Sequence, residues 1–205
     1  MTLRALASTD LRENPARVAL FLHGYGSNAR NLTGLASALP AGMPWASLEA
    51  PIPLAPGASA WFHITEPGDP DPAPVGAATD AIWSWVDDVL PPETTLVPIG
   101  FSQGGLMATQ LLRTRPDRAR TAVVLGGFVQ AAAQPADALL REERPEVFSG
   151  RGEDDRVITT AAVERTDAWL REHATATSRR YPGLAHGIDA RMLADVQAFL
   201  NPATP

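Results

Sequence analysis

Cysteine is absent from the sequence, and so is lysine, so that every basic side chain is an arginine. Without cysteine the chain can form no disulfide, thiolate nucleophile or sulfur-ligated metal site. Long apolar runs are also missing: none occurs before residues 18–22, a stretch far too short for a signal-peptide core or a membrane span. We therefore expect a cytoplasmic protein, without stable membrane insertion, whose chemistry uses oxygen and nitrogen groups.

A basic cluster is lacking as well. The formal net charge is −6, and the arginines are spread along the chain. Because phosphate binding needs a basic face, this distribution argues against a nucleic-acid partner and favours a small-molecule substrate. Apolar residues make up 45% and charged residues 20% of the 205 positions, which is an ordinary globular composition. A chain of this length fits one domain, and we expect it to span residues 1–205.

Apolar runs of strand type alternate with amphipathic segments of helix type along the chain. Strands are predicted at residues 17–22, 45–48, 94–99, 121–125, 146–148 and 178–181. Helices are predicted at residues 28–39, 77–89, 103–112, 159–172 and 190–200, with proline-rich loops at 50–59 and 66–74. This alternation predicts an α/β fold with a mostly parallel central sheet and helices on both faces, and functional loops at the carboxyl ends of the strands.

The string Gly-Phe-Ser-Gln-Gly at residues 100–104 lies between a predicted strand and a predicted helix. This is the context of a nucleophile elbow, in which a strained turn projects a serine above the sheet. Small neighbours allow such a turn to be tight, and Gly100, Gly104 and Gly105 meet that need. We therefore predict that Ser102 is a nucleophile, with a plain glycine-serine turn as the alternative.

A serine hydroxyl needs a base to accept its proton, and after such an elbow the carboxylate and then the histidine follow along the chain. Of the four histidines, only His173 and His186 follow Ser102. His173 ends a predicted helix, where a histidine is favourable without any further role. His186 lies in a loop between the last predicted strand and the last predicted helix, so it is the predicted general base.

The carboxylate that orients the histidine should follow the predicted strand at 146–148. The loop after that strand contains Glu153, Asp154 and Asp155. Spacing alone does not choose between Asp154 and Asp155, and the acids not used for chemistry would be a solvated cluster that caps the helix from Thr159.

Backbone N–H groups are the expected donors to the oxyanion that forms during acyl transfer. One would be the N–H of Gln103, directly after Ser102. The other would come from the loop after the first long strand, where Gly24 and Gly26 allow the N–H of Tyr25 to point at the site. The alternative for that loop is an ordinary turn. This chemistry needs no metal and no cofactor.

Taken together, these segments resemble the carboxylesterase/phospholipase family of α/β hydrolases, which includes acyl-protein thioesterases and small bacterial carboxylesterases. The resemblance runs nearly end to end. It is carried by Leu22-His23-Gly24-Tyr25-Gly26, Ala60-Trp61-Phe62, Gly100 through Gly105, Gly152-x-x-Asp155-x-Val157 and Ala185-His186-Gly187.

The resemblance implies an α/β-hydrolase fold without a large cap domain and with a shallow acyl groove. It places the family's aspartate on Asp155, with Asp154 as second choice, and its oxyanion donors on the N–H groups of Tyr25 and Gln103. Trp61 looks like the aromatic residue of the family's substrate loop, and it is predicted to be exposed and to bind substrate.

The predicted function is that of a serine carboxylesterase that hydrolyses short- to medium-chain acyl or aryl esters. Thioesterase or lysophospholipase activity with the same residues is an alternative, and so is a silent hydrolase fold that binds a ligand without turnover. Exposed tryptophans could also mark a homodimer interface or a contact with a membrane surface. Trp83, Trp85 and Trp169 lie on apolar helical faces and are predicted to pack in the core.

Overall fold

Seven strands form the central sheet of the computed structural model, which describes residues 3–13 and 15–202. Their order across the sheet is β1-β3-β2-β6-β7-β8-β9. All neighbours pair in parallel except β1 and β3, which are antiparallel. The strands are β1 (Ala5–Ala7), β2 (Arg17–Leu22), β3 (Trp45–Leu48), β6 (Thr95–Phe101), β7 (Thr121–Leu125), β8 (Glu146–Gly152) and β9 (Thr175–Tyr181).

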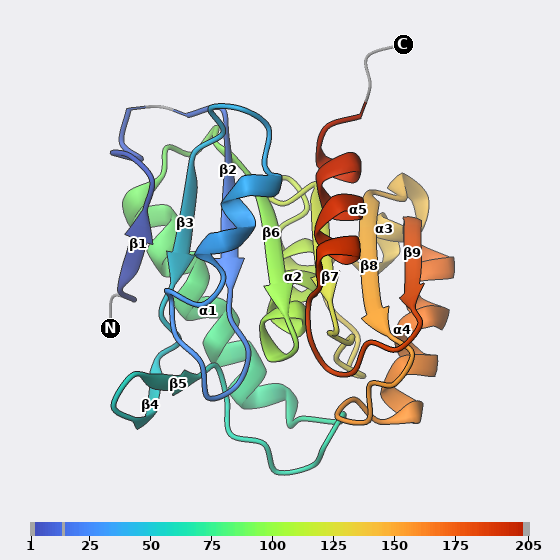
Figure 1. The fold of residues 1–205 in the computed structure, drawn as a ribbon. Coiled ribbons are helices and arrows are strands. Elements are labelled where there is room, and N and C mark those ends of the chain that lie inside the picture. The colour runs from blue at the N-terminus through green and yellow to red at the C-terminus, as the bar shows by residue number, and fades with distance from the viewer. Residues whose placement is uncertain (1–2, 14, 203–205) are drawn as a thin grey trace.

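Helices cover both faces of the sheet (Figure 1). One face carries α1 (Pro72–Val89), α2 (Gln103–Thr114), α3 (Asp137–Glu143) and α4 (Thr160–His173). The other face carries a short 3₁₀ helix, η1 (Thr33–Ala38), and the last helix, α5 (Ala190–Leu200), which contact each other. The predicted α/β fold with a mostly parallel sheet and helices on both faces is confirmed.

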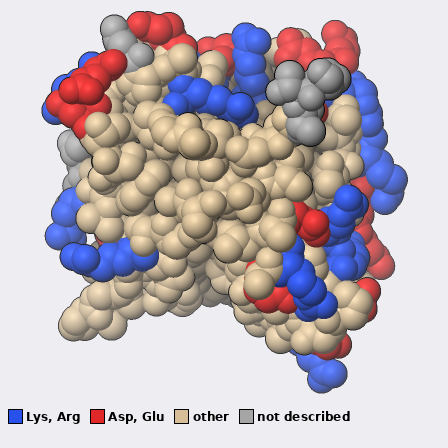
Figure 2. All heavy atoms as spheres, turned by 45° about the horizontal axis from the view of Figure 1, so that its top comes forward, with Lys and Arg blue, Asp and Glu red and all other residues tan. Residues whose placement is uncertain are grey.

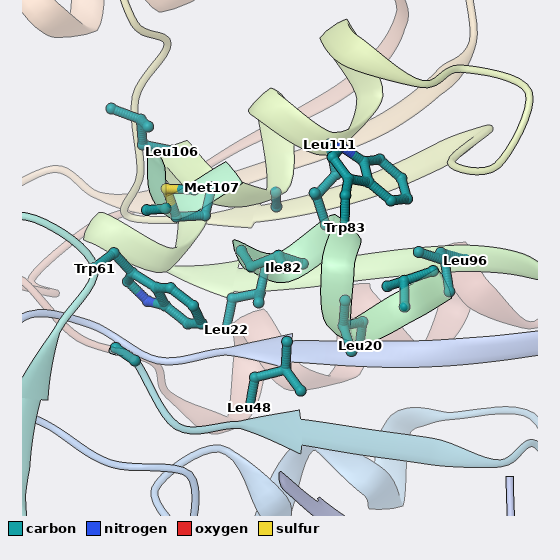
Figure 3. Packing of buried hydrophobic residues seen from close by; sticks show 14 of the residues in the cluster. Leu20, Leu22, Leu48, Trp61, Ile82, Trp83, Leu96, Leu106, Met107 and Leu111 are labelled. Carbon is teal, nitrogen blue, oxygen red and sulfur yellow. The ribbon is translucent and has the colours of Figure 1, made fainter. Parts of the chain in front are cut away.

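Strand β2 shows why the core has two halves. Successive side chains of a strand point to opposite faces, so an entirely apolar strand can pack against helices on both sides. Leu20 and Leu22 contact the apolar faces of α1 and α2 (Figure 3), whereas Phe21 belongs to the cluster that includes side chains of η1 and α5. Burying each such side chain contributes about 1.5–3 kcal/mol to stability. Trp83, Trp85 and Trp169 are buried in these layers, as predicted.

The segment predicted as a helix at 28–39 is helical only in η1. At its start the Asn28 side chain accepts a hydrogen bond from the N–H of Arg30, and the N–H of Ala29 donates to the carboxylate of Glu49. Side chains that bind nearby backbone N–H groups compete with helix formation. The helix prediction was therefore wrong for the first part of this segment.

The proline-rich segment predicted as a loop at 50–59 contains most of an antiparallel hairpin, β4 (Ile52–Ala55) and β5 (Ala58–Ala60). Gly57, with a φ of 75°, lies in its turn, a conformation that glycine adopts readily. The hairpin is separate from the main sheet, so Pro53 can lack an N–H without breaking the central ladder. Strand β1 and helix α3 were not predicted, because both are short.

Charged side chains of both signs lie around the margin of the face shown in Figure 2, and the middle of that face has almost none. Arginines and acidic residues adjoin one another there, so this face has no continuous basic patch. Among the described residues, no helix combines the length and the apolar composition that a membrane crossing requires.

Parallel pairing brings the carboxyl ends of β2, β6, β7, β8 and β9 to one edge of the sheet, the lower edge in Figure 1. The loops that follow these strands therefore meet, although they are far apart in the sequence. The predicted site residues lie on or directly after these loops, except Trp61, which follows β5.

Candidate active site

Ser102 occupies the sharp turn between β6 and α2. Its backbone has a φ of 55° and a ψ of −117°, and it is one of two described non-glycine residues with a positive φ. Such a conformation is strained for a side-chain-bearing residue and persists only where the surroundings hold it. A hydrogen bond of 2.8 Å from the N–H of Ser102 to the carbonyl of Leu125 on β7 contributes to that restraint.

The glycines around Ser102 are required by close backbone contacts. A Cβ at Gly104 would lie 1.8 Å from the carbonyl oxygen of Leu22, and a Cβ at Gly100 would lie 2.0 Å from the carbonyl oxygen of Gly104. Any side chain at either position would displace backbone. The elbow therefore packs directly on the end of β2, next to the loop that carries Tyr25.

His186 joins Ser102 to Asp155 by two hydrogen bonds. Its Nε2 lies 2.9 Å from the Oγ of Ser102, and its Nδ1 lies 2.8 Å from the Oδ2 of Asp155. A carboxylate can only accept, so Nδ1 carries the proton and Nε2 is left as the acceptor for the serine hydroxyl. The loops after β6, β8 and β9 thus bring the three predicted residues into one connected chain of hydrogen bonds.

The side chain of Asp155 is fully buried and is held on both oxygens. Besides His186, it accepts hydrogen bonds from the N–H groups of Val157 at 2.9 Å and Ile158 at 3.3 Å, and Arg151 lies 3.7 Å from its Oδ2. Burial by itself would raise the pKa of Asp155, but the hydrogen bonds and the attraction to His186 outweigh it and leave this pKa below its usual value. Asp155 is therefore ionised at neutral pH.

Asp154, the alternative to Asp155, is exposed. Its N–H donates to the carbonyl of Leu184, which helps to join the two loops that carry Asp155 and His186. The hydrogen bond to His186 comes from Asp155, and the structure thus distinguishes two acids that their spacing left equivalent.

Tyr25 and Gln103 line the same cavity as Ser102. Within residues 3–13 and 15–202, neither of their backbone N–H groups has a hydrogen-bond acceptor in the protein. Backbone donors of this kind beside a nucleophile can bind the negatively charged oxygen of a tetrahedral intermediate. Both predicted donors therefore belong to residues that line the cavity beside Ser102.

The loop before Tyr25 rests on a buried histidine. His23 is inaccessible to solvent; its Nδ1 donates to the carbonyl of Gly24 at 2.8 Å, and its Nε2 accepts from the N–H of Ala50 at 3.1 Å. Burial lowers the pKa of His23, against smaller opposing effects from the Gly24 carbonyl and from Glu49. A neutral His23 thus holds the start of this loop through its two hydrogen bonds.

Trp61 lies where the sequence did not predict it. Its side chain is 1% exposed, among Leu22, Leu48 and Ile82 in the core (Figure 3), and its indole N–H donates to the carbonyl of His23 at 2.9 Å. The prediction that Trp61 is exposed was wrong, and Trp61 is not among the residues that line the cavity beside Ser102. The residue after it, Phe62, lines the cavity instead.

The side chain of Gln103 connects the elbow to the segment that contains Trp61 and Phe62. Its Oε1 accepts from the N–H of Trp61 at 2.9 Å, and its Nε2 donates to the carbonyl of Phe62 at 2.8 Å. Gln103 is 3% exposed, so both hydrogen bonds are shielded from water. The sequence indicated a role for its backbone but not for its side chain.

Beside Ser102 opens a cavity of about 230 Å³ with a mainly apolar lining. Its walls are formed by Phe62, Ile64, Phe128, Val157, Ile158 and the segment 66–70. Most of these residues were not predicted, although the Trp-Phe pair and Val157 were noted as motif residues. Phe128 follows a pair of glycines after β7, which is the only local signal for it. Three of the exposed large apolar side chains, those of Tyr25, Ile64 and Val157, surround the opening.

Among the described residues, no group of three or more histidine, aspartate or glutamate side chains is arranged to hold a metal ion. The groups that the site brings together are a hydroxyl, an imidazole, a carboxylate and two backbone N–H groups beside an apolar cavity.

Comparison with solved structures reveals the same fold in several esterases. A Bacillus cereus carboxylesterase matches with a TM-score of 0.82 and 20% identity, over 98% of this chain and 95% of that one. A Mesorhizobium loti carboxylesterase matches with a TM-score of 0.77 and 18% identity, over 98% and 95% of the two chains. A phospholipase/carboxylesterase from Dyadobacter fermentans matches with a TM-score of 0.75 and 17% identity, over 97% and 96%.

A search of curated proteins gives no match. The model of the phospholipase/carboxylesterase family, in contrast, matches residues 7–204, which is nearly the whole chain. The chain belongs to the phospholipase/carboxylesterase family.

Proposed function

We propose that the protein is a serine carboxylesterase that hydrolyses short- to medium-chain acyl or aryl esters through an acyl-enzyme on Ser102. The observation that carries this proposal is the pair of hydrogen bonds that joins Ser102 through His186 to the buried side chain of Asp155, beside an apolar cavity. A hydroxyl, a base and an orienting carboxylate in this order are what an activated serine requires.

In the first step, Ser102 Oγ attacks the ester carbonyl carbon while His186 Nε2 takes the hydroxyl proton. Asp155 stabilises the resulting imidazolium, and the N–H groups of Tyr25 and Gln103 donate to the oxyanion. As the tetrahedral intermediate collapses, the bond from carbon to the alcohol oxygen breaks, and His186 gives its proton to that oxygen. The alcohol leaves, and the acyl group stays on Ser102.

In the second step, a water molecule takes the place of the alcohol. His186 removes a proton from the water as its oxygen bonds to the acyl carbon, and the same two N–H groups bind the new oxyanion. The bond to Ser102 Oγ then breaks, His186 returns the proton to that oxygen, and the carboxylic acid is released.

The size of the cavity favours substrates whose acyl chain is of limited length. Its volume of about 230 Å³ corresponds to roughly eight groups of the size of a water molecule, at about 30 Å³ each. A lining that is mainly apolar favours hydrocarbon over charged groups. Acyl chains up to about octanoyl would therefore be accommodated inside the cavity.

The test is hydrolysis of a series of p-nitrophenyl esters, from acetate to palmitate, by the wild-type protein and by Ser102→Ala. The variant should lose about four to six powers of ten in kcat, and a fluorophosphonate should label the wild type alone. Undiminished turnover by Ser102→Ala would refute the proposal. Hydrolysis of thioesters but not of oxygen esters would favour the thioesterase alternative, and labelling without turnover of either would favour a silent binding protein.

A further inference from the structure

Residues 66–70, called the far wall below, line part of the cavity and form neither helix nor strand. Segment 66–70 contributes Glu66, Pro67, Gly68 and Pro70 to the lining of the cavity that Ser102 and Gln103 also line. Within the described residues, its only hydrogen bond between two backbone groups is the local one from the N–H of Asp69 to the carbonyl of Glu66, at 3.3 Å. The backbone ladder of the sheet therefore does not hold this wall in place.

Side chains from distant parts of the chain hold it instead. Arg165 on α4 donates to the carbonyl of Gly68 through its terminal guanidinium and to the carbonyl of Val129 through Nε, the latter at 2.9 Å. The buried Gln130 donates through Nε2 to the carbonyl of Pro70 at 3.0 Å. These bonds connect the far wall to the loop after β7, whose Phe128 faces the same cavity.

The next residue of α4 completes this attachment. The hydroxyl of Thr166 accepts a hydrogen bond of 3.0 Å from the N–H of Val129, so α4 binds both polar groups of that residue's backbone. Gly68 itself lies close to the start of α4, because a Cβ there would be 2.3 Å from the Oγ1 of Thr159. The contact between the far wall and α4 is thus made by backbone and polar side chains.

Arginine is suited to this position. Its guanidinium is planar and carries several fixed donors, so one side chain can bind two carbonyls that face it from different segments. A lysine could keep the charge but would lack this fork. A methionine could keep most of the volume but would donate to neither carbonyl.

We propose that Arg165 is a specificity-determining residue, which holds segment 66–70 against the loop 128–130 and thereby sets the acyl-chain preference of the cavity. This inference rests on the proposed function, in which the acyl group of the substrate occupies the cavity. An octanoyl chain would extend to segment 66–70, whereas an acetyl group would stay beside Ser102. Arg165 touches none of the reacting groups, so its effect should appear only with chains long enough to meet the wall.

The experiment compares kcat and KM for p-nitrophenyl acetate and octanoate in the wild type, Arg165→Met, Arg165→Lys and Arg171→Met. Arg171 is exposed in the last turn of the same helix and is the matched control. In Arg165→Met, the ratio of kcat/KM for octanoate to that for acetate should fall about tenfold, mainly through KM, because contacts to an ordered apolar wall are lost. Acetate turnover should stay within about twofold. Arg165→Lys should also lose selectivity, and Arg171→Met should keep it.

An unchanged octanoate-to-acetate ratio in Arg165→Met would overturn the inference while the esterase function stands. An equal loss for both substrates would overturn it as well, since it would indicate a general structural defect. If Arg165→Met does not fold, Arg165→Lys carries the test, with the same ratio as the readout. Failure of the wild type to hydrolyse acetate would instead refute the proposed function, and the inference with it.

Discussion

The two ends of the cavity are built in different ways. At the end that contains Ser102, the backbone itself sets the geometry: a strained residue and glycines that leave no space for a Cβ pack the elbow on the end of β2. At the far end, segment 66–70 has no regular structure and is attached by the side chains of Arg165 and Gln130. Close backbone packing tolerates almost no substitution, whereas attachment by side chains can change one residue at a time.

This difference separates the groups proposed to react with the ester from the wall proposed to meet its acyl chain. The groups proposed to act on the ester follow the ends of strands, so the backbone of the sheet fixes their positions. The position of the wall proposed to meet the acyl chain depends on a few polar side chains, and none of these takes part in the proposed reaction. Changes at the two ends should therefore have separable effects on turnover and on selectivity.

The largest effect is expected at the backbone-built end. Asp155→Asn should lower kcat by about 10⁴, because an amide cannot keep His186 in the required tautomer or stabilise its charge. Asp154→Asn, the matched control on the neighbouring exposed residue, should change kcat by no more than about twofold. Steady-state kinetics with p-nitrophenyl acetate measures both. A small loss in both variants would mean that either acid can serve.

A middle effect is expected at Gln103, whose side chain joins the Ser102 end of the cavity to the segment that contains Trp61 and Phe62. Gln103→Leu keeps the backbone N–H but leaves the N–H of Trp61 and the carbonyl of Phe62 buried without partners. The free energy of unfolding should fall by about 2–4 kcal/mol, as measured by urea denaturation. The exposed Gln197→Leu is the control and should change it by less than about 0.5 kcal/mol. Similar stabilities of the two variants would show that the connection does not contribute.

The smallest effect concerns the support beneath the loop of Tyr25. The folded-state pKa of His23 is lowered by burial, so the unfolded chain binds this proton first as the pH falls below about 6.5. His23 therefore contributes stability that is present above that pH and is lost as the pH falls through its lowered folded-state pKa. Urea midpoints at about pH 7.5 and about pH 5.5 should differ more in the wild type than in His23→Gln. Equal differences would exclude His23 as a source of acid sensitivity.

Several features were predictable because their signals are local. An apolar run such as residues 18–22 of β2 indicates a strand buried on both faces, and a Gly-x-Ser-x-Gly string between a strand and a helix indicates an elbow. Chain order then pointed to the loop that carries His186. In these cases the residues that carry the signal lie in the same short segment as the structure that they predict.

Other features depend on which distant residues pack together. Trp61 was expected on the surface because its segment follows prolines, yet Leu22, Leu48 and Ile82 surround it in the core. The segment 28–39 has helical periodicity, yet Glu49 binds the N–H of Ala29 near its start. The residues that decide each outcome lie outside the segment concerned, so neither outcome could be predicted from local sequence.

The sequence by itself determined the alternation of the longer strands and helices, the elbow at Ser102 and the loop of His186, because short-range periodicity and backbone sterics specify them. The family resemblance favoured Asp155 over Asp154, and the tertiary structure shows that Asp155 is the one hydrogen-bonded to His186. Only the tertiary structure decided that Trp61 is buried and that Arg165 reaches Gly68 from the other half of the chain. Those outcomes depend on contacts between segments that are far apart in the sequence, and such contacts leave no signature in the spacing of the residues that make them.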